Sequence, residues 1–127
     1  ESNRTWAHHA PVLMLSVAKL YFEEDGKPNR HAFHDVGLAV ENLAIQAVAL
    51  NLFVHQMAGF SIERAREQFG IPERYEPVAM IAVGYPGDPS ILPDRLRERE
   101  FRPRGRKAIT EFVFSGVWGK TSPLATK

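Results

Sequence analysis

Residues 41–60 of this chain, ENLAIQAVALNLFVHQMAGF, decide its fold. The first part of the stretch completes a helical pattern that begins at about residue 31 and continues to about residue 54. Apolar side chains cover most of the circumference in the second half of that pattern, which is typical of a helix enclosed on all sides. A chain of 127 residues has little room to bury such a helix, so we expect a subunit interface to supply the missing cover.

The end of the stretch predicts a break in the chain followed by a shorter helix. Residues 55–60 are expected to end the long helix, with Gly59 as the place for unusual backbone geometry. Ser61 is expected to cap a second helix over residues 62–69, and the Gly-Ile-Pro sequence that follows is typical of a helix end.

Apolar runs before and after this region predict strands. Residues 11–18 and 78–83 are short, apolar and without helical periodicity, which is typical of strands buried on both faces. Residues 94–100 predict a short exposed helix or coil, and residues 110–117 predict a last strand. The two buried strands do not suffice for a stable sheet, and the chain begins without methionine close to a strand. We therefore expect a chain that was cut or processed upstream.

Composition excludes several classes of function. The chain has no cysteine, which excludes disulfides, thiolate nucleophiles and cysteine-based zinc sites and fits a cytoplasmic protein. The net charge is +1, from 16 basic and 15 acidic side chains, and exerts no global attraction for nucleic acid or membrane. No apolar run reaches the roughly 18 residues of a transmembrane helix. We expect neither nucleic acid nor membrane as a partner.

One histidine cluster invites a metal-binding interpretation. His31 and His34 lie at helical spacing, with Asp35 beside them, and two imidazoles so spaced could share a metal. The alternative is a polar helix start, with Asp35 near the positive end of the helix dipole and solvated histidines. We favour the second interpretation and predict no metal site.

Residues 95–107 are rich in arginine. Acidic side chains alternate with arginines in the first half, so only residues 102–107 are purely basic. Four cations in six residues, around one proline and one glycine, suit a compact anion such as a mononucleotide phosphate. A solvated loop remains an alternative, and RNA or DNA binding by residues 95–107 is a further one, which would require binding that falls steeply with salt.

An ordered series of motifs resembles the nitroreductase family over nearly the whole chain. Residues 41–60 resemble the buried helix and following loop of that family, which end in Gly-Phe. Three further segments follow in step, and one precedes: residues 68–72, residues 78–86, residues 106–113 with Trp118, and Trp6 with residues 10–12. Asn51 stands where the family usually has glycine, and Ala108 where it usually has proline.

The resemblance implies an α+β fold. This is a three-layer sandwich, a mostly antiparallel sheet flanked by helices, built as an intertwined homodimer with FMN at the subunit interface and a C-terminal arm that crosses to the partner. Residues 1–127 would form a single domain that lacks its N-terminal portion, because the family's Arg-x-Ser-x-Arg phosphate anchor has no counterpart here. We therefore expect the fold to be incomplete in this chain.

The resemblance also implies a cofactor site without a catalytic side chain, since the chemistry takes place on the flavin. The backbone N–H groups of Ala58 and Gly59 would approach the N5 and O4 edge of the isoalloxazine, and a side chain at Gly59 would hold the flavin away. Arg106, with Arg104 or Lys107, would pair with the FMN phosphate. The expected FMN-binding residues are Gln56, Met57, Ala58, Gly59, Arg104 and Arg106.

The implied function is an FMN-dependent oxidoreductase. It would use NAD(P)H to reduce nitroaromatic, quinone or related conjugated small-molecule acceptors. One alternative is a shortened, non-catalytic dimeric module without flavin. For Gln56 to Gly59 the corresponding alternative is a plain loop at the end of a helix.

Overall fold

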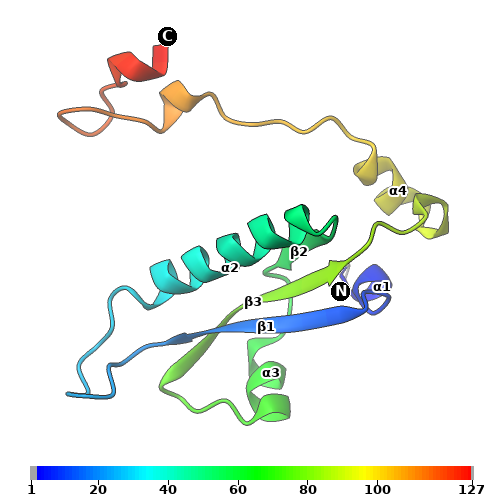
Figure 1. Cartoon of the computed structure of the whole chain (residues 1–127), viewed down its shortest axis with the longest axis horizontal. Helices are drawn as coiled ribbons and strands as arrows, with labels where there is room; N and C mark the ends of the chain where they lie inside the picture. Colours follow the sequence, from blue (N-terminus) through cyan, green and yellow to red (C-terminus); the bar gives the residue numbers. More distant parts are fainter. Residues whose placement is uncertain (1–2, 127) are drawn as a thin grey trace. The chain divides into compact units, whose positions relative to one another are not determined.

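A computed structural model describes residues 3–126 of the chain, which divides into two compact units. The first unit is Glu1–Asp88 and the second is Pro89–Lys127. Each unit is described by itself. The first holds an antiparallel sheet with helices, so the predicted α+β class is confirmed (Figure 1).

A three-stranded antiparallel sheet organises the first unit. Its strands are β1 (Val12–Lys19), β2 (Phe53–Met57) and β3 (Tyr75–Gly84), in the spatial order β1-β3-β2. Both strands predicted from apolar runs are confirmed, and they pair with each other, from Val12 opposite Val83 to Lys19 opposite Tyr75. The sheet therefore joins segments that lie about sixty residues apart in the chain.

The long helix ends earlier than its apolar pattern predicted. Helix α2 is Ala32–Ala49, not 31–54, and the segment predicted to be a loop begins instead with strand β2. The chain reverses at Asn51, the one non-glycine residue of the described part with a positive φ (58°). The unusual backbone geometry predicted at Gly59 is wrong, because this glycine is not among those with a positive φ. Phe53 to Met57 then pair with Gly84 to Met80 of β3, because pairing supplies the backbone hydrogen bonds that the ended helix no longer supplies.

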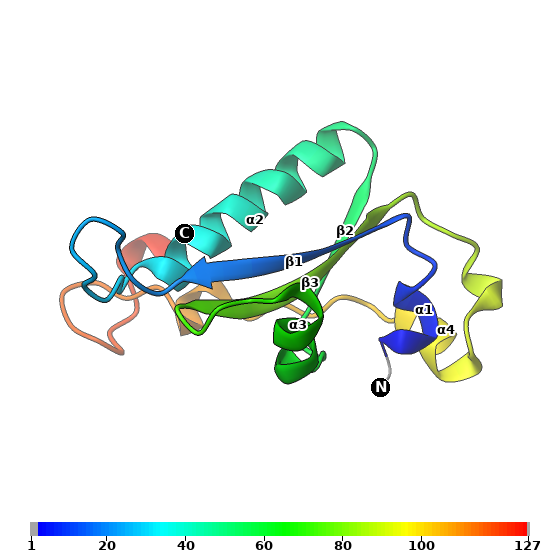
Figure 2. The same ribbon diagram turned by 90° about the horizontal axis from the view of Figure 1, so that it is seen from below.

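Helices cover both faces of the sheet. Helix α2 lies over one face, while α1 (Arg4–Ala7) and α3 (Ile62–Phe69) lie on the other (Figure 2). On the α1 side, Ala7 packs with Met57 and Ala82 in a small core that Trp6, Ala10 and Met80 border. The core of this unit thus depends on small side chains and methionine.

Helix α3 follows its sequence signals closely. Ser61 accepts a hydrogen bond at its Oγ from the backbone N–H of Arg64 (3.2 Å), and Gly70 ends the helix in the left-handed region (φ 60°). Arg66 fastens the helix to β3, because its guanidinium donates to the carboxylate of Glu76 (2.5 Å) and to the carbonyl of Pro72 (3.1 Å). Both predictions for this helix, its cap and its end, are confirmed.

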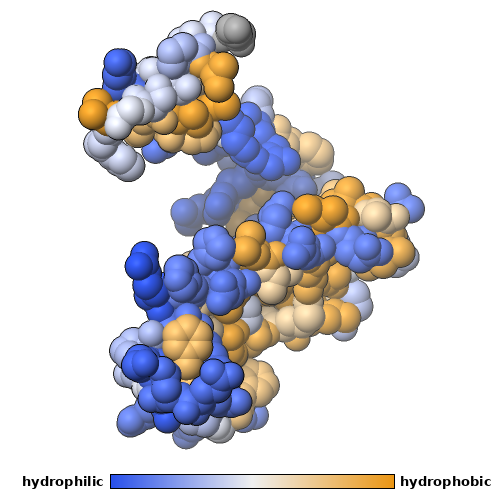
Figure 3. Space-filling view, turned by 60° about the vertical axis from the view of Figure 1, so that its left-hand side comes forward, coloured by the Kyte–Doolittle hydropathy of each residue, from blue (hydrophilic) through white to orange (hydrophobic). Residues whose placement is uncertain are grey.

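The chain leaves much apolar surface uncovered. The prediction of strands buried on both faces is wrong at the start of β1, where Val12 and Leu13 are 47% and 43% exposed. Helix α2 is likewise apolar on an outer face, and the space-filling view shows apolar areas reaching the surface (Figure 3). The exposed large apolar residues of this helix and its end are Phe33, Leu38, Ile45, Val48 and Leu50.

The second unit is made of short elements. It holds η1 (Pro89–Ile91), α4 (Asp94–Glu100), η2 (Ile109–Glu111) and η3 (Pro123–Thr126), so the short helix at residues 94–100 is confirmed. The predicted strand over residues 110–117 is wrong. Glu111 caps a tight turn by accepting from the N–H of Ala108 (2.9 Å), and only an isolated bridge between Phe114 and Thr121 forms. Among the described residues, no helix combines the length and the apolar character needed to cross a bilayer.

Candidate functional site

The segment expected to line a flavin spans the end of β2 and the turn that follows it. Gln56 and Met57 belong to the strand, whereas Ala58 and Gly59 lie in the connection to α3. Met57 is 4% exposed and its side chain is part of the core, so only its backbone is available to a ligand. Gln56, Ala58 and Gly59 are exposed.

The Ala58–Gly59 turn presents two unused backbone donors. Phe60 donates its N–H to the carbonyl of Ala58 (3.0 Å), and the side-chain amide of Asn3 donates to the carbonyl of Gly59 (3.3 Å). The N–H groups of Ala58 and Gly59 donate to no acceptor within residues 3–126. A Cβ at Gly59 would meet Asn3 Nδ2 at 3.2 Å, which is a tight contact, so the Asn3 side chain lies directly beside this glycine.

Helix α1 supports the turn from the adjacent face of the sheet. The Trp6 ring packs edge-to-face on His55 of β2, with ring centroids 4.8 Å apart and an interplanar angle of 76°. Sequence reasoning assigned Trp6 to the approach to a strand and gave Asn3 no role. A helix of four residues has no detectable periodicity, so no local signal reveals it.

An open hollow lies next to the turn, between α3 and β3. Phe60 and Ser61 form the end nearest the turn, and Met80 contributes from the sheet. The wall mixes apolar and charged side chains, which suits a ligand with an aromatic part and a polar part. The lining residues are Phe60, Ser61, Arg64, Ala65, Glu67, Gln68, Phe69 and Met80.

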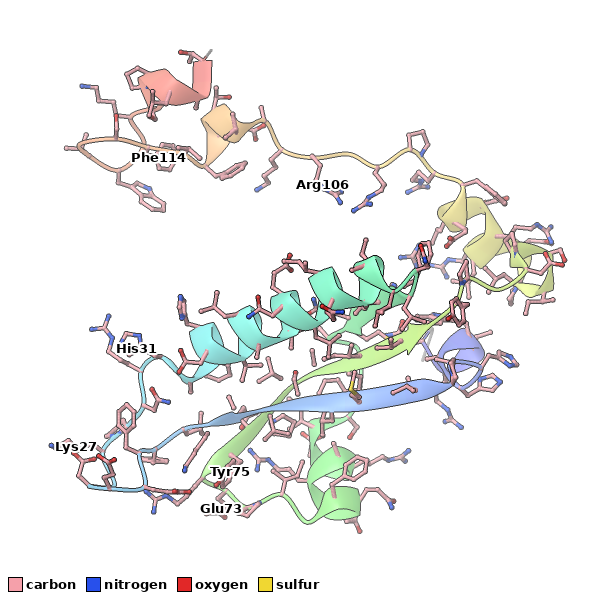
Figure 4. The ribbon with its side chains drawn as sticks, viewed as in Figure 1. Lys27, His31, Glu73, Tyr75, Arg106 and Phe114 are labelled. Atoms are coloured by element: carbon pink, nitrogen blue, oxygen red, sulfur yellow. The ribbon has the colours of Figure 1, made fainter. Side chains whose placement is uncertain are left out.

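The two arginines predicted to bind phosphate belong to the second unit. Arg104 and Arg106 are exposed and lie in the extended segment between α4 and η2. Arg106, which lies on the extended segment (Figure 4), donates from its guanidinium to the neighbouring carbonyl of Gly105 (2.9 Å). Neither arginine forms an ion pair within the described part of the chain. Both are therefore free to bind an anion, while the Ala58–Gly59 turn belongs to the first unit.

The histidine cluster has the polar surroundings of a helix start. His34 Nδ1 lies 3.5 Å from the carboxylate of Asp35, and both side chains are well exposed. Within residues 3–126, no three side chains of the metal-binding types come together. Near the turn, the pKa of Glu63 is held below its ordinary value, because its carboxylate accepts from its own backbone N–H and from Ser61 Oγ.

Comparison with known proteins agrees with this fold. The nitroreductase family pattern matches residues 1–85. A 15.4 kDa protein from the region 5' of ask in Mycolicibacterium smegmatis is 39% identical over 115 residues, which cover 91% of this chain and 76% of that protein. The chain therefore belongs to the nitroreductase family.

Two solved structures share the fold of this chain. The crystal structure of an oxidoreductase containing FMN superposes with a TM-score of 0.87 at 34% identity, over 95% of this chain and 62% of that one. A nitroreductase family protein of Clostridium difficile 630 shares the fold, with a TM-score of 0.61 at 23% identity, over 87% of this chain. This chain spans 62% of the length of each of these two solved chains.

Proposed function

We propose that this protein acts, in its full-length form, as an FMN-dependent oxidoreductase. The observation that carries the proposal is the Ala58–Gly59 turn, which exposes two backbone N–H groups that no acceptor within residues 3–126 satisfies. Such fixed donors stabilise negative charge that develops on a bound ring. The proposal is supported by the similarity of this chain to an oxidoreductase containing FMN.

The residues of the turn fit an isoalloxazine edge. Gly59 brings no side chain between its backbone and a ligand, and the hollow beside Phe60 offers apolar contact to a flat ring. Gln56 adds an exposed side-chain amide, and the backbone of Met57 completes the segment. The N–H groups of Ala58 and Gly59 would stabilise electron density at one edge of the ring, and the chemistry that bound FMN supplies is two-electron transfer.

The phosphate end of the cofactor would be held by Arg104 and Arg106. A guanidinium binds a phosphate through paired, charge-assisted hydrogen bonds, and both side chains are exposed without an ion pair in the described residues. That the two units form one domain with a shared site in the full-length protein stays a prediction.

We further propose that the functional form is a cytoplasmic homodimer. Helix α2 exposes Val48 (70%) and Ile45 (61%), and the second unit exposes Trp118 (91%). Exposed apolar surface on this scale marks an association surface, and a second copy of the chain would cover it. The proposed reaction is reduction of a nitroaromatic, quinone or related conjugated acceptor by NAD(P)H.

Purified full-length protein tests the proposal directly. We expect a flavin absorbance spectrum, and oxidation of NAD(P)H that depends on an added nitroaromatic or quinone. Replacing Gly59 by valine crowds the Asn3 side chain, whose Nδ2 a Cβ would meet at 3.2 Å, and so displaces the turn at the proposed ring edge; FMN affinity should fall. Gly87→Val is the control, because a Cβ there meets no atom within 4 Å. Full-length protein that neither contains nor binds FMN would disprove the proposal.

A second candidate function is a non-catalytic dimeric module that has lost the flavin. It is favoured by one observation: Val48 and Ile45 of α2 are exposed, and a dimer formed through this helix needs no flavin. A single measurement, the titration of the protein into FMN, distinguishes the two candidate functions. A module of this kind would dimerise through α2 but would show no change in flavin fluorescence when titrated into FMN.

A further inference from the structure

The side chain of Asn3 is hydrogen-bonded to the Ala58–Gly59 turn. Its side-chain amide donates to the carbonyl of Gly59, across a separation of 56 residues in the chain. Asn3 is itself held at the start of α1, since its carbonyl accepts from the N–H of Ala7 (2.9 Å). The contact therefore links one element of the fold to the segment that we propose for flavin binding.

Two peptide planes carry this contact to the N–H of Gly59. In a trans peptide, the C=O and the N–H point to opposite sides of one rigid plane. The peptide between Gly59 and Phe60 is held at both ends, because its carbonyl accepts from Asn3 and its N–H donates to Ala58. The carbonyl of Ala58, held by Phe60, belongs to the same plane as the N–H of Gly59. That N–H is thus turned away from Phe60.

Helix α1, which follows Asn3, is packed firmly against the sheet. Trp6 packs against His55 of β2, and Ala7 is buried with Met57 in the core. Helix α1 is consequently fixed to the strand that leads into the turn. The donor of Asn3 and its acceptor are held by parts of the same unit.

We propose that Asn3 is a positioning residue for the flavin. It holds the Ala58–Gly59 turn in the one orientation that directs the N–H of Gly59 outward to the cofactor. This inference rests on the proposed FMN-dependent function. Donors that are already in place need no reorganisation when a ligand binds. Loosening the turn therefore weakens FMN binding and reduces the preference of the site for reduced over oxidised flavin.

The test compares three variants of the full-length protein. Asn3→Ala removes the donor, and Asn3→Asp keeps the shape of the side chain while replacing the donor by a carboxylate oxygen. Thr5→Ala is the matched control, since Thr5 is an exposed residue of the same helix. For each, we would measure hydrogen exchange at the Phe60 N–H without FMN, the FMN dissociation constant, the flavin midpoint potential and the Tm.

We expect faster hydrogen exchange at the Phe60 N–H in both Asn3 variants, because the hydrogen bond of this N–H to Ala58 loosens with the turn. FMN binding should weaken about three- to tenfold, the range for one hydrogen bond. The midpoint potential should fall, by about 30 mV for each tenfold loss of preference for the reduced form. The Tm should change by less than about 4 °C, and Thr5→Ala should match the unaltered protein. A merely structural role would lower the Tm and leave the potential unchanged.

The contrary outcomes are distinct. Asn3 variants that keep the exchange rates, FMN affinity and potential of the unaltered protein overturn the positioning role and leave the proposed function intact. Loss of binding by Asn3→Ala that follows a fall in Tm, with normal binding by Asn3→Asp, also overturns it. Unaltered protein that binds no FMN overturns both, and this outcome is seen without any variant.

Discussion

Gly84 lies where the end of β3 passes the proline that precedes β1. A Cβ on Gly84 would lie 2.7 Å from Cδ and 3.0 Å from Cγ of Pro11, and a proline ring cannot rotate out of the way. We predict that Gly84→Ala lowers the free energy of unfolding by about 1–3 kcal/mol, the usual cost of overpacking. Urea denaturation measures it. Gly87→Ala is the control, with open space around its Cβ, and equal effects of the two substitutions would refute this reason for glycine at residue 84.

Asn51 has the backbone conformation of a glycine. Its φ of 58° lies in the left-handed region, which costs other residues about 1–2 kcal/mol and costs asparagine less. We predict that Asn51→Ala lowers the free energy of unfolding by about 1 kcal/mol and that Asn51→Gly leaves it within about 0.5 kcal/mol of the unaltered value. Thermal unfolding of both variants checks the difference. Asn51→Ala and Asn51→Gly of equal stability would contradict the proposed strain.

At the scale of elements, Ser61 stabilises the beginning of α3 as its cap. Ser61→Ala removes the acceptor of the Arg64 N–H, and we predict a loss of about 1 kcal/mol in the free energy of unfolding. Chemical denaturation at neutral pH measures this loss. A loss no larger than that of a neutral surface substitution would contradict the capping role.

The acid side of the stability profile should depend on Glu63. Its folded-state pKa is lowered by its own backbone N–H and by Ser61, so its contribution is present above the unfolded-state pKa and is lost as the pH falls through the folded-state pKa. We predict that Glu63→Gln removes this part of the decline in stability below the ordinary glutamate pKa. Glu67→Gln is the control, because Glu67 is an exposed carboxylate of the same helix with no ion pair in the described residues. This variant should retain the decline in stability. Unfolding curves measured from neutral to acidic pH distinguish the two.

For the whole molecule, the exposed apolar face of α2 predicts self-association. Val48 is 70% exposed, and a glutamate there would have to be desolvated in an interface between two copies. We predict a dimer for the unaltered full-length protein and a monomer for Val48→Glu, with the same circular dichroism. Analytical ultracentrifugation measures both. Gln46→Glu adds the same charge at an exposed polar position of this helix and should remain dimeric. A monomeric unaltered protein would refute the interface.

Most of the fold follows from short-range sequence signals. The apolar runs of β1 and β3, the Ser61 cap and the Gly70 end of α3 were all predictable, because each depends on residues a few positions apart. The motifs at residues 41–60 and 78–86 likewise identified the nitroreductase family, which the comparisons confirm. The candidate FMN site, from Gln56 to Gly59 with Arg104 and Arg106, came from that resemblance and stays a prediction.

Residues 41–60, together with the other motifs of the series, thus pointed to the family from the sequence, while the tertiary structure decided what this stretch becomes. Its apolar periodicity continues to residue 54, but pairing with β3 turns Phe53 to Met57 into a strand. No local pattern could show this, because the hydrogen-bond partners of a strand lie far away in the chain. The same reason conceals the contact of Asn3 with Gly59, 56 residues apart. Periodicity and caps report neighbours in sequence, and only the packed sheet brings α1 to the turn that the family pattern assigns to the flavin.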